Sequence, residues 1–184
     1  MHDQDDAARV ERYLNGEERA FAELYAKYRP RLAAYCYRLL LDAARTEEAV
    51  QAVFARAVES IRSLRNPSSF RSWLFTMARN EIYGLLRTAR AGPTVELSED
   101  VWDTETPHEN AVRGEVVRMV REALDRLKVE YREVLILRQF EGLSYAEIAA
   151  ITGNSISSVE SRLFKARRAL TRELEPYFDS RSES

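Results

Sequence analysis

The chain contains one cysteine and two histidines among its 184 residues. A single cysteine, Cys36, excludes an internal disulfide and a multi-cysteine zinc site, and its apolar surroundings favour a buried structural thiol. His2 and His108 are not near Cys36 in the sequence, and neither a glycine-rich phosphate loop nor a metal-ligand spacing is present. We therefore predict that the protein is not an enzyme and has no catalytic residue, metal site or cofactor.

Long hydrophobic runs are also missing. No stretch approaches the roughly 18 consecutive apolar residues of a membrane-spanning helix. The first residues, MHDQDDAARVER, are acidic and polar, unlike the basic start and apolar run of a signal peptide. The net charge is only −2, so the chain as a whole is not a general ligand for polyanions. The composition is that of a soluble globular protein, and we expect it to be cytoplasmic.

Strand signals are absent too, because no segment alternates apolar and polar residues, and Ala, Leu, Glu and Arg are abundant. Apolar residues instead recur every three or four positions. This spacing predicts helices over residues 21–40 with an interruption at Pro30, and then over 46–62, 70–90, 112–127, 130–140, 145–152 and from 156 onward. Thr46 is the expected N-cap of the helix that it opens, and Asn66–Ser69 is an expected turn.

A linker is predicted between two groups of helices. The stretch from Gly92 to Asn110 holds six acids and no Lys or Arg, has a proline near each end and lacks a helical period. The expected fold class is therefore all-α, with two small helical domains joined by an acidic flexible linker. The predicted boundaries are 1–17 for an N-terminal extension, 18–91 for the first domain, 92–110 for the linker, 111–178 for the second domain and 179–184 for a disordered tail.

The segment LSYAEIAAITGNSISSVESRLFKARRAL, residues 143–170, has the pattern of a helix-turn-helix. Ser144 and Ser155 are expected to cap its two helices, and Gly153 is the natural left-handed residue that closes the first. The expected inward residues are Ala146, Ile148 and Ala149 in the first helix, and Ile156, Val159, Leu163, Ala166 and Leu170 in the second.

The second helix of this pair presents polar and basic residues outward. Between Ser155 and Arg172 five basic residues stand against one acid, Glu160. Serine hydroxyls are short hydrogen-bonding groups, and arginine grips guanine with two hydrogen bonds, whereas Arg167, Arg168 and Arg172 are better placed for phosphates. A solvated polar face on a helical hairpin is the alternative, but the turn chemistry and the apolar spacing favour DNA reading.

Two blocks of the sequence resemble a known family. LDRLKVEYREVLILRQFEGLSYAEIAAITGNSISSVESRLFKARRAL resembles the C-terminal promoter-binding domain of bacterial sigma factors, above all the extracytoplasmic-function group. AFAELYAKYRPRLAAYCYRLL, TEEAVQAVFARAVESI and SFRSWLFTMARNEIYGLLR are similar to the sigma-2 domain. The resemblance covers about residues 18–90 and 110–176, and two blocks in the right order are more specific than one helix-turn-helix.

The resemblance implies a sigma-2-like helical bundle, a sigma-4-like helix-turn-helix domain, and a function as an alternative sigma factor. Its partners would be core RNA polymerase, through the clamp helices and the flap, promoter DNA, and an anti-sigma factor that wedges between the domains. The implied polymerase contacts are Glu47, Glu48, Gln51 and Phe54. The implied −10 contacts are Asn66, Ser68, Ser69, Arg71, Arg79, Asn80 and Arg87. The implied −35 contacts are Ser157, Ser158, Glu160, Ser161, Arg162, Lys165 and Arg168.

Melted strands are held by positive charge and stacking surfaces. Residues 70–90 offer four aromatic side chains for that purpose: Phe70, Trp73, Phe75 and Tyr83. For Trp73, which lies on the apolar stripe of its helix, we favour a place in the core.

Three positions depart from the family pattern. Ala52 and Gly84 stand where acids are usual, and Glu160 replaces a usual lysine. We hypothesise that Glu160 either accepts a hydrogen bond from cytosine N4 or lowers affinity for non-cognate promoters. We further hypothesise that phosphorylation of Thr46 adds charge at the docking surface. The competing functions are a stand-alone helix-turn-helix regulator, which would not need the N-terminal arginine–aromatic block, and a helical scaffold.

Overall fold

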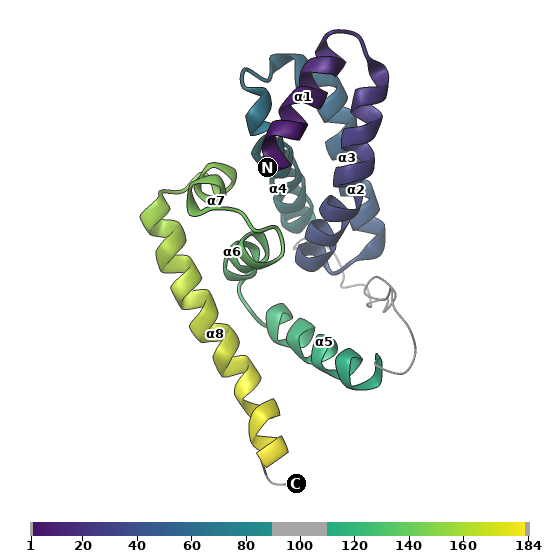
Figure 1. The fold of residues 1–184 in the computed structure, drawn as a ribbon. Helices are drawn as coiled ribbons and strands as arrows, with labels where there is room; N and C mark the ends of the chain where they lie inside the picture. Colours follow the sequence, from purple (N-terminus) through teal and green to yellow (C-terminus); the bar gives the residue numbers. More distant parts are fainter. Residues whose placement is uncertain (1, 90–109, 183–184) are drawn as a thin grey trace. The chain divides into compact units, whose positions relative to one another are not determined.

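The computed structural model describes residues 2–89 and 110–182, which form eight α-helices and two short 3-10 helices and contain no strand (Figure 1). These helices divide into two compact units. The first unit contains α1 to α4, and the second contains α5, α6, α8 and most of α7. The all-α prediction is confirmed. The predicted linker, 92–110, lies outside the described residues except for Asn110, which opens α5.

The N-terminal unit is built around α2. Its elements are α1 (His2–Leu14), α2 (Glu18–Leu40), α3 (Ala43–Ser60), η1 (Ile61–Ser63), η2 (Pro67–Ser69) and α4 (Phe70–Ala89). Helix α2 packs against α1, α3 and α4. Residues 1–17, to which the sequence analysis assigned no element, contribute α1, and Val10 on that helix is buried.

Helix α2 runs through Pro30 without a break, so the predicted interruption is wrong. Leu24, Tyr28 and Leu32 keep one continuous buried stripe on either side of the proline. Pro30 itself is exposed, so the carbonyl that loses its helical hydrogen bond faces water. Tertiary packing of the stripe therefore outweighs the local cost of the proline.

Helix α3 begins earlier than predicted, and its N-cap is Asp42 rather than Thr46. The Asp42 carboxylate accepts a hydrogen bond from the backbone N–H of Arg45 at 2.9 Å. Thr46 is buried inside the first turn, where its hydroxyl donates to the Asp42 carbonyl at 2.7 Å. Phosphorylation of Thr46 would need that turn to open. The apolar stripe of α3 is buried, but Val58 is exposed.

The C-terminal unit consists of α5 (Asn110–Asp125), α6 (Val129–Gln139), most of α7 (Tyr145–Thr152) and α8 (Ile156–Ser182). Helix α8 packs against α6 and α5, and the ion pair between Arg132 and Asp125, 3.1 Å long, links α6 to α5. Because α8 continues to Ser182, residues 179–182 are helical rather than part of a disordered tail.

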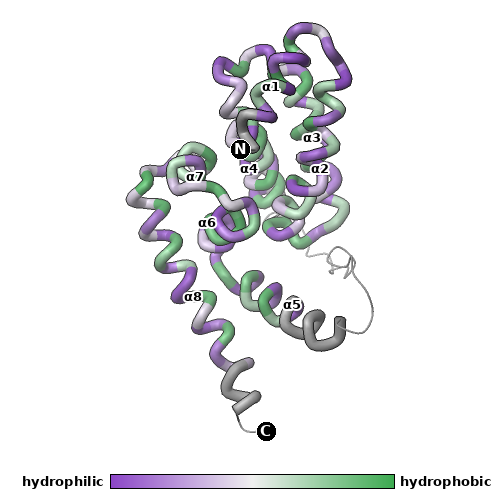
Figure 2. The backbone as a smooth tube through the Cα atoms, in the orientation of Figure 1, coloured by the Kyte–Doolittle hydropathy of each residue, from purple (hydrophilic) through white to green (hydrophobic). Residues whose placement is uncertain are grey.

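Figure 2 shows apolar and polar residues following one another along the helices that it colours. Across residues 2–89 and 110–182, no helix combines the length and the apolar character that crossing a bilayer requires.

Candidate nucleic-acid and polymerase interfaces

The turn chemistry of the helix-turn-helix is confirmed in detail. The Glu147 carboxylate accepts from the backbone N–H of Ser144 at 2.7 Å, and the Ser144 hydroxyl accepts from the Glu147 N–H at 3.2 Å, which is a reciprocal capping box. Gly153 follows α7 with a φ of +67°, in the left-handed region. The Ser155 hydroxyl then accepts from the Ser158 N–H at 3.2 Å and caps α8. Local hydrogen bonds thus fix where the second helix starts.

Helix α8 has one buried side and one side that is exposed to solvent. Val159, Leu163 and Ala166 are buried. The predicted −35 contacts lie on the remaining surface: Ser157, Glu160, Ser161, Lys165 and Arg168 are exposed, and Ser158 and Arg162 are half-buried. Two inward assignments are wrong, because Ala146 and Ile156 are exposed.

Phe164 is an exposed aromatic residue that the sequence analysis did not select. Its side chain is 61% exposed, and the Arg168 guanidinium lies 5.7 Å from the ring centroid. Ser157, Ser161, Phe164 and Arg168 are spaced so that they share one face of α8. The signal was available, because position 164 falls outside the stripe of buried residues. The face therefore combines hydroxyls, positive charge and an apolar ring.

The turn before α4 is held by its own side chains. The Asn66 side-chain oxygen accepts from the Ser68 N–H at 3.1 Å, and the Ser69 hydroxyl donates to the Asn66 carbonyl at 2.7 Å. Pro67 occupies the first helical position of η2, where its missing N–H costs nothing. Asn66 and Ser68 are exposed and Ser69 is half-buried. In this state Asn66 and Ser69 shape the turn, and Ser68 is its most accessible hydroxyl.

The aromatic residues of α4 divide into two groups. Phe70 and Phe75 are buried, with ring centroids 5.6 Å from Tyr28 and 5.2 Å from Tyr35. They are core residues and not stacking platforms. Trp73, which we assigned to the core, is only half-buried. The surfaces available for stacking on α4 therefore come from Trp73 and from Tyr83.

Charged and polar groups accompany these two rings. The Arg79 guanidinium lies 4.4 Å from the Tyr83 ring centroid. Asn80 and Arg87 are exposed. Asn80 lies seven residues after Trp73, and Arg87 lies seven residues after Asn80. Two helical turns bring residues spaced by seven to nearly the same side. Arg71 is half-buried near the start of the helix.

The predicted polymerase contacts lie at the junction of α2 and α3. Arg29 forms an ion pair with Glu47 at 3.1 Å, and Gln51 donates to Glu47 at 3.2 Å. Glu47 raises the pKa of Arg29, which keeps the guanidinium charged. Glu48 and Gln51 are exposed.

Phe54 does not belong to the exposed part of this junction. Its side chain is only 5% exposed, and its ring centroid lies 4.6 Å from that of Tyr25. Tyr25 is exposed, so it is the ring that a partner would meet first. The packing of α2 on α3 therefore buries Phe54, which the resemblance implied as a polymerase contact, and leaves Tyr25 exposed.

Comparisons with known proteins match both parts of this chain. Residues 24–92 match the family described as Sigma-70 region 2, and residues 118–170 match the family described as Sigma-70, region 4. The chain is 30% identical over 182 residues to the RNA polymerase sigma-H factor of Pseudomonas aeruginosa, with 93% of this chain and 94% of the relative covered. It is 31% identical over 184 residues to the ECF RNA polymerase sigma-E factor of Haemophilus influenzae, with 93% and 96% covered.

A solved structure is similar over most of the chain as well. It is the sigma factor RpoE in complex with the anti-sigma factor NepR from Bartonella quintana, with a TM-score of 0.69 and 26% identity. The alignment covers 84% of this chain and 96% of that one. The two matched regions, the full-length relatives and this shared fold lead to one conclusion. The chain belongs to the sigma-70 family of RNA polymerase sigma factors, in its extracytoplasmic-function group, and it directs RNA polymerase to promoters.

Proposed function

We propose that this sigma factor divides promoter recognition between its two units, with the N-terminal unit holding the melted −10 element and the C-terminal unit reading the −35 duplex. The observation that carries the proposal is that α4 and α8 each bury one face and present arginine and aromatic side chains on another. The predicted domain limits, 18–91 and 111–178, remain part of this proposal.

For the upstream element, the N-terminal half of α8 enters the major groove. Lys165 and Arg162 suit the acceptors of guanine, and an exposed ring such as Phe164 suits the methyl group of thymine. Arg167, Arg168 and Arg172 supply positive charge beside the phosphates. Base contacts and phosphate contacts thus come from successive turns of one helix.

For the downstream element, η2 and α4 receive the opened strand. Trp73 and Tyr83 offer rings for stacking, and Arg79, Asn80 and Arg87 offer charge and hydrogen bonds. A base that leaves the duplex loses a few kcal/mol of stacking, which hydrogen bonds in a pocket must return. Ser68 on η2 and the amide of Asn66, the N-cap residue of η2, are the groups that can supply them.

Docking on core polymerase is assigned to the α2–α3 junction. Glu48 and Gln51 are exposed there, and the Arg29–Glu47 pair lies beside them. Tyr25 adds an aromatic surface of the kind enriched at protein interfaces. Phe54 supports this surface from below. Because a similar structure contains an anti-sigma factor, we also propose that an anti-sigma protein holds this chain inactive.

The protein is proposed to work by binding, without a catalytic residue, and in the cytoplasm, where its polymerase partner is found. The alternative weighed in the sequence analysis, a stand-alone helix-turn-helix regulator, is set aside because both sigma-70 regions match this chain.

The decisive experiment is reconstitution with core RNA polymerase on a library of promoter sequences, followed by run-off transcription. We expect a spaced pair of elements to be enriched and specific transcripts to appear only when the chain is added. Enrichment of a single element, or transcripts that depend on only one of the two elements, would refute the division of promoter recognition between the two units.

A further inference from the structure

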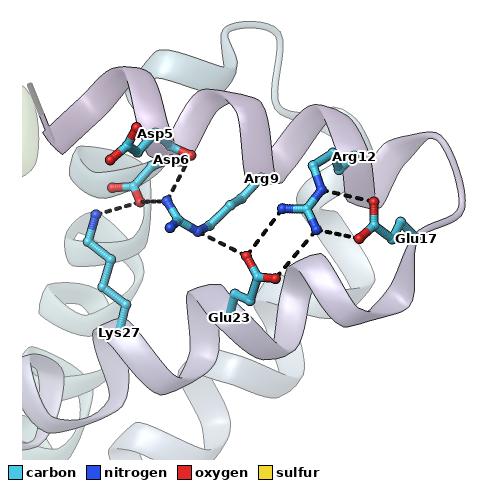
Figure 3. A network of polar contacts seen from close by, with 7 residues as sticks. All are labelled: Asp5, Asp6, Arg9, Arg12, Glu17, Glu23 and Lys27. Carbon is cyan, nitrogen blue, oxygen red and sulfur yellow. Dashed lines mark hydrogen bonds and ion pairs between the residues drawn. The ribbon is translucent and has the colours of Figure 1, made fainter.

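Helix α1 is tied to α2 by a network of ion pairs, which we call the α1 clasp (Figure 3). Its members are Asp6, Arg9, Arg12, Glu17, Glu23 and Lys27. At one end, Arg12 contacts Glu17 and Glu23, and Arg9 donates to Glu23 at 3.2 Å. These groups are partly exposed. Exposed pairs of this kind contribute little stability individually.

The other end of the clasp is buried. Asp6 is 1% exposed. Its carboxylate accepts from Lys27 Nζ at 2.5 Å and from the Tyr28 hydroxyl at 2.5 Å. Burial, followed by the contact with Asp6, raises the pKa of Tyr28, so the hydroxyl stays protonated and remains a donor. A buried carboxylate with two short hydrogen bonds defines the position of its partners closely.

Tyr28 connects this carboxylate to the proposed single-strand site. Its ring lies edge-on to Phe70, with centroids 5.6 Å apart. Phe70 is the first residue of α4, and its backbone N–H donates to the Pro67 carbonyl within η2. Helix α1 also packs directly against η2 and α4. A continuous chain of contacts therefore runs from Asp6 through Tyr28 and Phe70 to the turn.

We propose that Asp6 is a positioning residue for promoter melting. Its hydrogen bond with the Tyr28 hydroxyl fixes the position of the Tyr28 ring, which contacts Phe70. The position of Phe70 in turn determines the orientation in which η2 meets the displaced strand. This inference rests on the proposed function, because it assumes that residues 66–69 hold that strand. It gives α1 a role in DNA opening, although none of the −10 contacts lies on α1. In enzymes, a mutation far from the reacting groups that displaces them slightly can remove much of the activity.

The test uses the full chain bound to core polymerase and two labelled probes. One is a forked duplex whose single-stranded end carries the −10 sequence selected by the parent protein, and the other is the closed −35 duplex. Asp6→Ala is expected to weaken binding of the forked probe by roughly tenfold, with binding of the closed duplex and of core polymerase unchanged. Tyr28→Phe keeps the ring but loses the hydroxyl, and it should behave like Asp6→Ala.

Two variants separate positioning from folding. Asp6→Asn keeps an acceptor for the Tyr28 hydroxyl and should retain most of the affinity for the forked probe. Val53→Ala removes buried methyl groups from α3, a helix that contributes no member to the contact chain, and serves as a control for lost thermal stability. It should leave forked-probe binding unchanged at a temperature where both variants are folded.

Equal losses of forked-probe affinity in Asp6→Ala and Val53→Ala, or no loss in Asp6→Ala, would overturn the positioning role. The proposed function fails separately, namely when the parent holoenzyme does not prefer the forked probe over a closed duplex of the same sequence. A fluorescent base analogue at the unpaired position gives a second readout. Its signal should fall in Asp6→Ala even at probe concentrations that saturate binding.

Discussion

The reactivity of the Cys36 thiol depends on where the residue lies in the fold. Cys36 is buried in α2, and burial raises the pKa of its thiol to about 12. An ordinary thiol has a pKa of about 8.5. At pH 8 the folded protein therefore holds almost no thiolate at this position. The thiolate is the reactive form, so Cys36 is expected to be inert in the native state.

This expectation is tested with a thiol reagent at pH 8. The native chain should react at least about a hundredfold more slowly than the chain in denaturant, because both access and ionisation are lost. Comparable rates in the two states would show that the thiol is accessible and would contradict the buried assignment.

Glu160 is the one acid among the predicted −35 contacts on α8, and it is exposed. Glu160→Lys should raise affinity for non-cognate DNA and increase the slope of affinity against salt by about one, because one more phosphate contact forms. Titration of a random duplex at several salt concentrations measures both. Glu175→Lys, exposed on the same helix beyond the helix-turn-helix, is the matched control. Unchanged binding and promoter choice would refute a role for Glu160.

At the scale of elements, α4 carries a glycine that its helix does not require. A Cβ added at Gly84 would meet only the Arg87 side chain, at 4.0 Å. Gly84→Ala should therefore stabilise the N-terminal unit by about 1 kcal/mol, the difference in helix propensity. Thermal unfolding followed by circular dichroism should show a rise of roughly 4 °C.

Gly153→Ala is the matched control for that substitution. Gly153 has a φ of +67°, which L-residues with a Cβ rarely adopt. The same change there should destabilise the helix-turn-helix by about 1 kcal/mol. If Gly84→Ala instead lowers the melting temperature, the packing around α4 is tighter than the structure indicates.

The docking of α1 depends on carboxylates and should weaken in acid. Hydrogen bonds from Arg12 lower the pKa of Glu17 and Glu23 from the ordinary value of 4.5. A carboxylate with a lowered pKa in the folded state adds stability above its ordinary pKa, and that stability disappears as the pH falls through the lowered value. Parent protein and Arg12→Gln should thus differ in melting temperature at pH 7 and converge as the pH falls below 4.5 and through the lowered pKa values of Glu17 and Glu23. A difference that persists at low pH would show that Arg12 acts by packing.

At the scale of the whole molecule, two recognition faces lie in two separate units. When two binding units are joined and their spacing is fixed, binding of the first unit to DNA raises the effective concentration of the second unit at its own site. The free chain should therefore bind a complete promoter hardly better than an isolated −35 duplex. In the presence of core polymerase, affinity for the complete promoter should rise by at least roughly a hundredfold.

Competition binding with the two duplexes, with and without core polymerase, measures this difference. A free chain that already prefers the complete promoter by that factor would show that the units are aligned without polymerase.

The sequence alone determined the features that depend on near neighbours. Ser144, Gly153 and Ser155 define the helix-turn-helix through hydrogen bonds and a dihedral angle within a few residues, and the structure has all three as expected. The helical period likewise placed α4 and α6 within about one residue of their ends. Local geometry is set by local chemistry, so these predictions needed no knowledge of the fold.

Only the tertiary structure decided which faces meet. It continued α2 through Pro30, because a buried stripe outweighs one missing hydrogen bond. It buried Phe54 and exposed Tyr25, and it left Phe164 exposed on the face of α8 that we propose reads DNA. It also docked the polar N-terminal segment as helix α1, in which Asp6 accepts hydrogen bonds from Lys27 and Tyr28. These outcomes depend on contacts between residues far apart in the chain, which periodicity and capping rules do not encode.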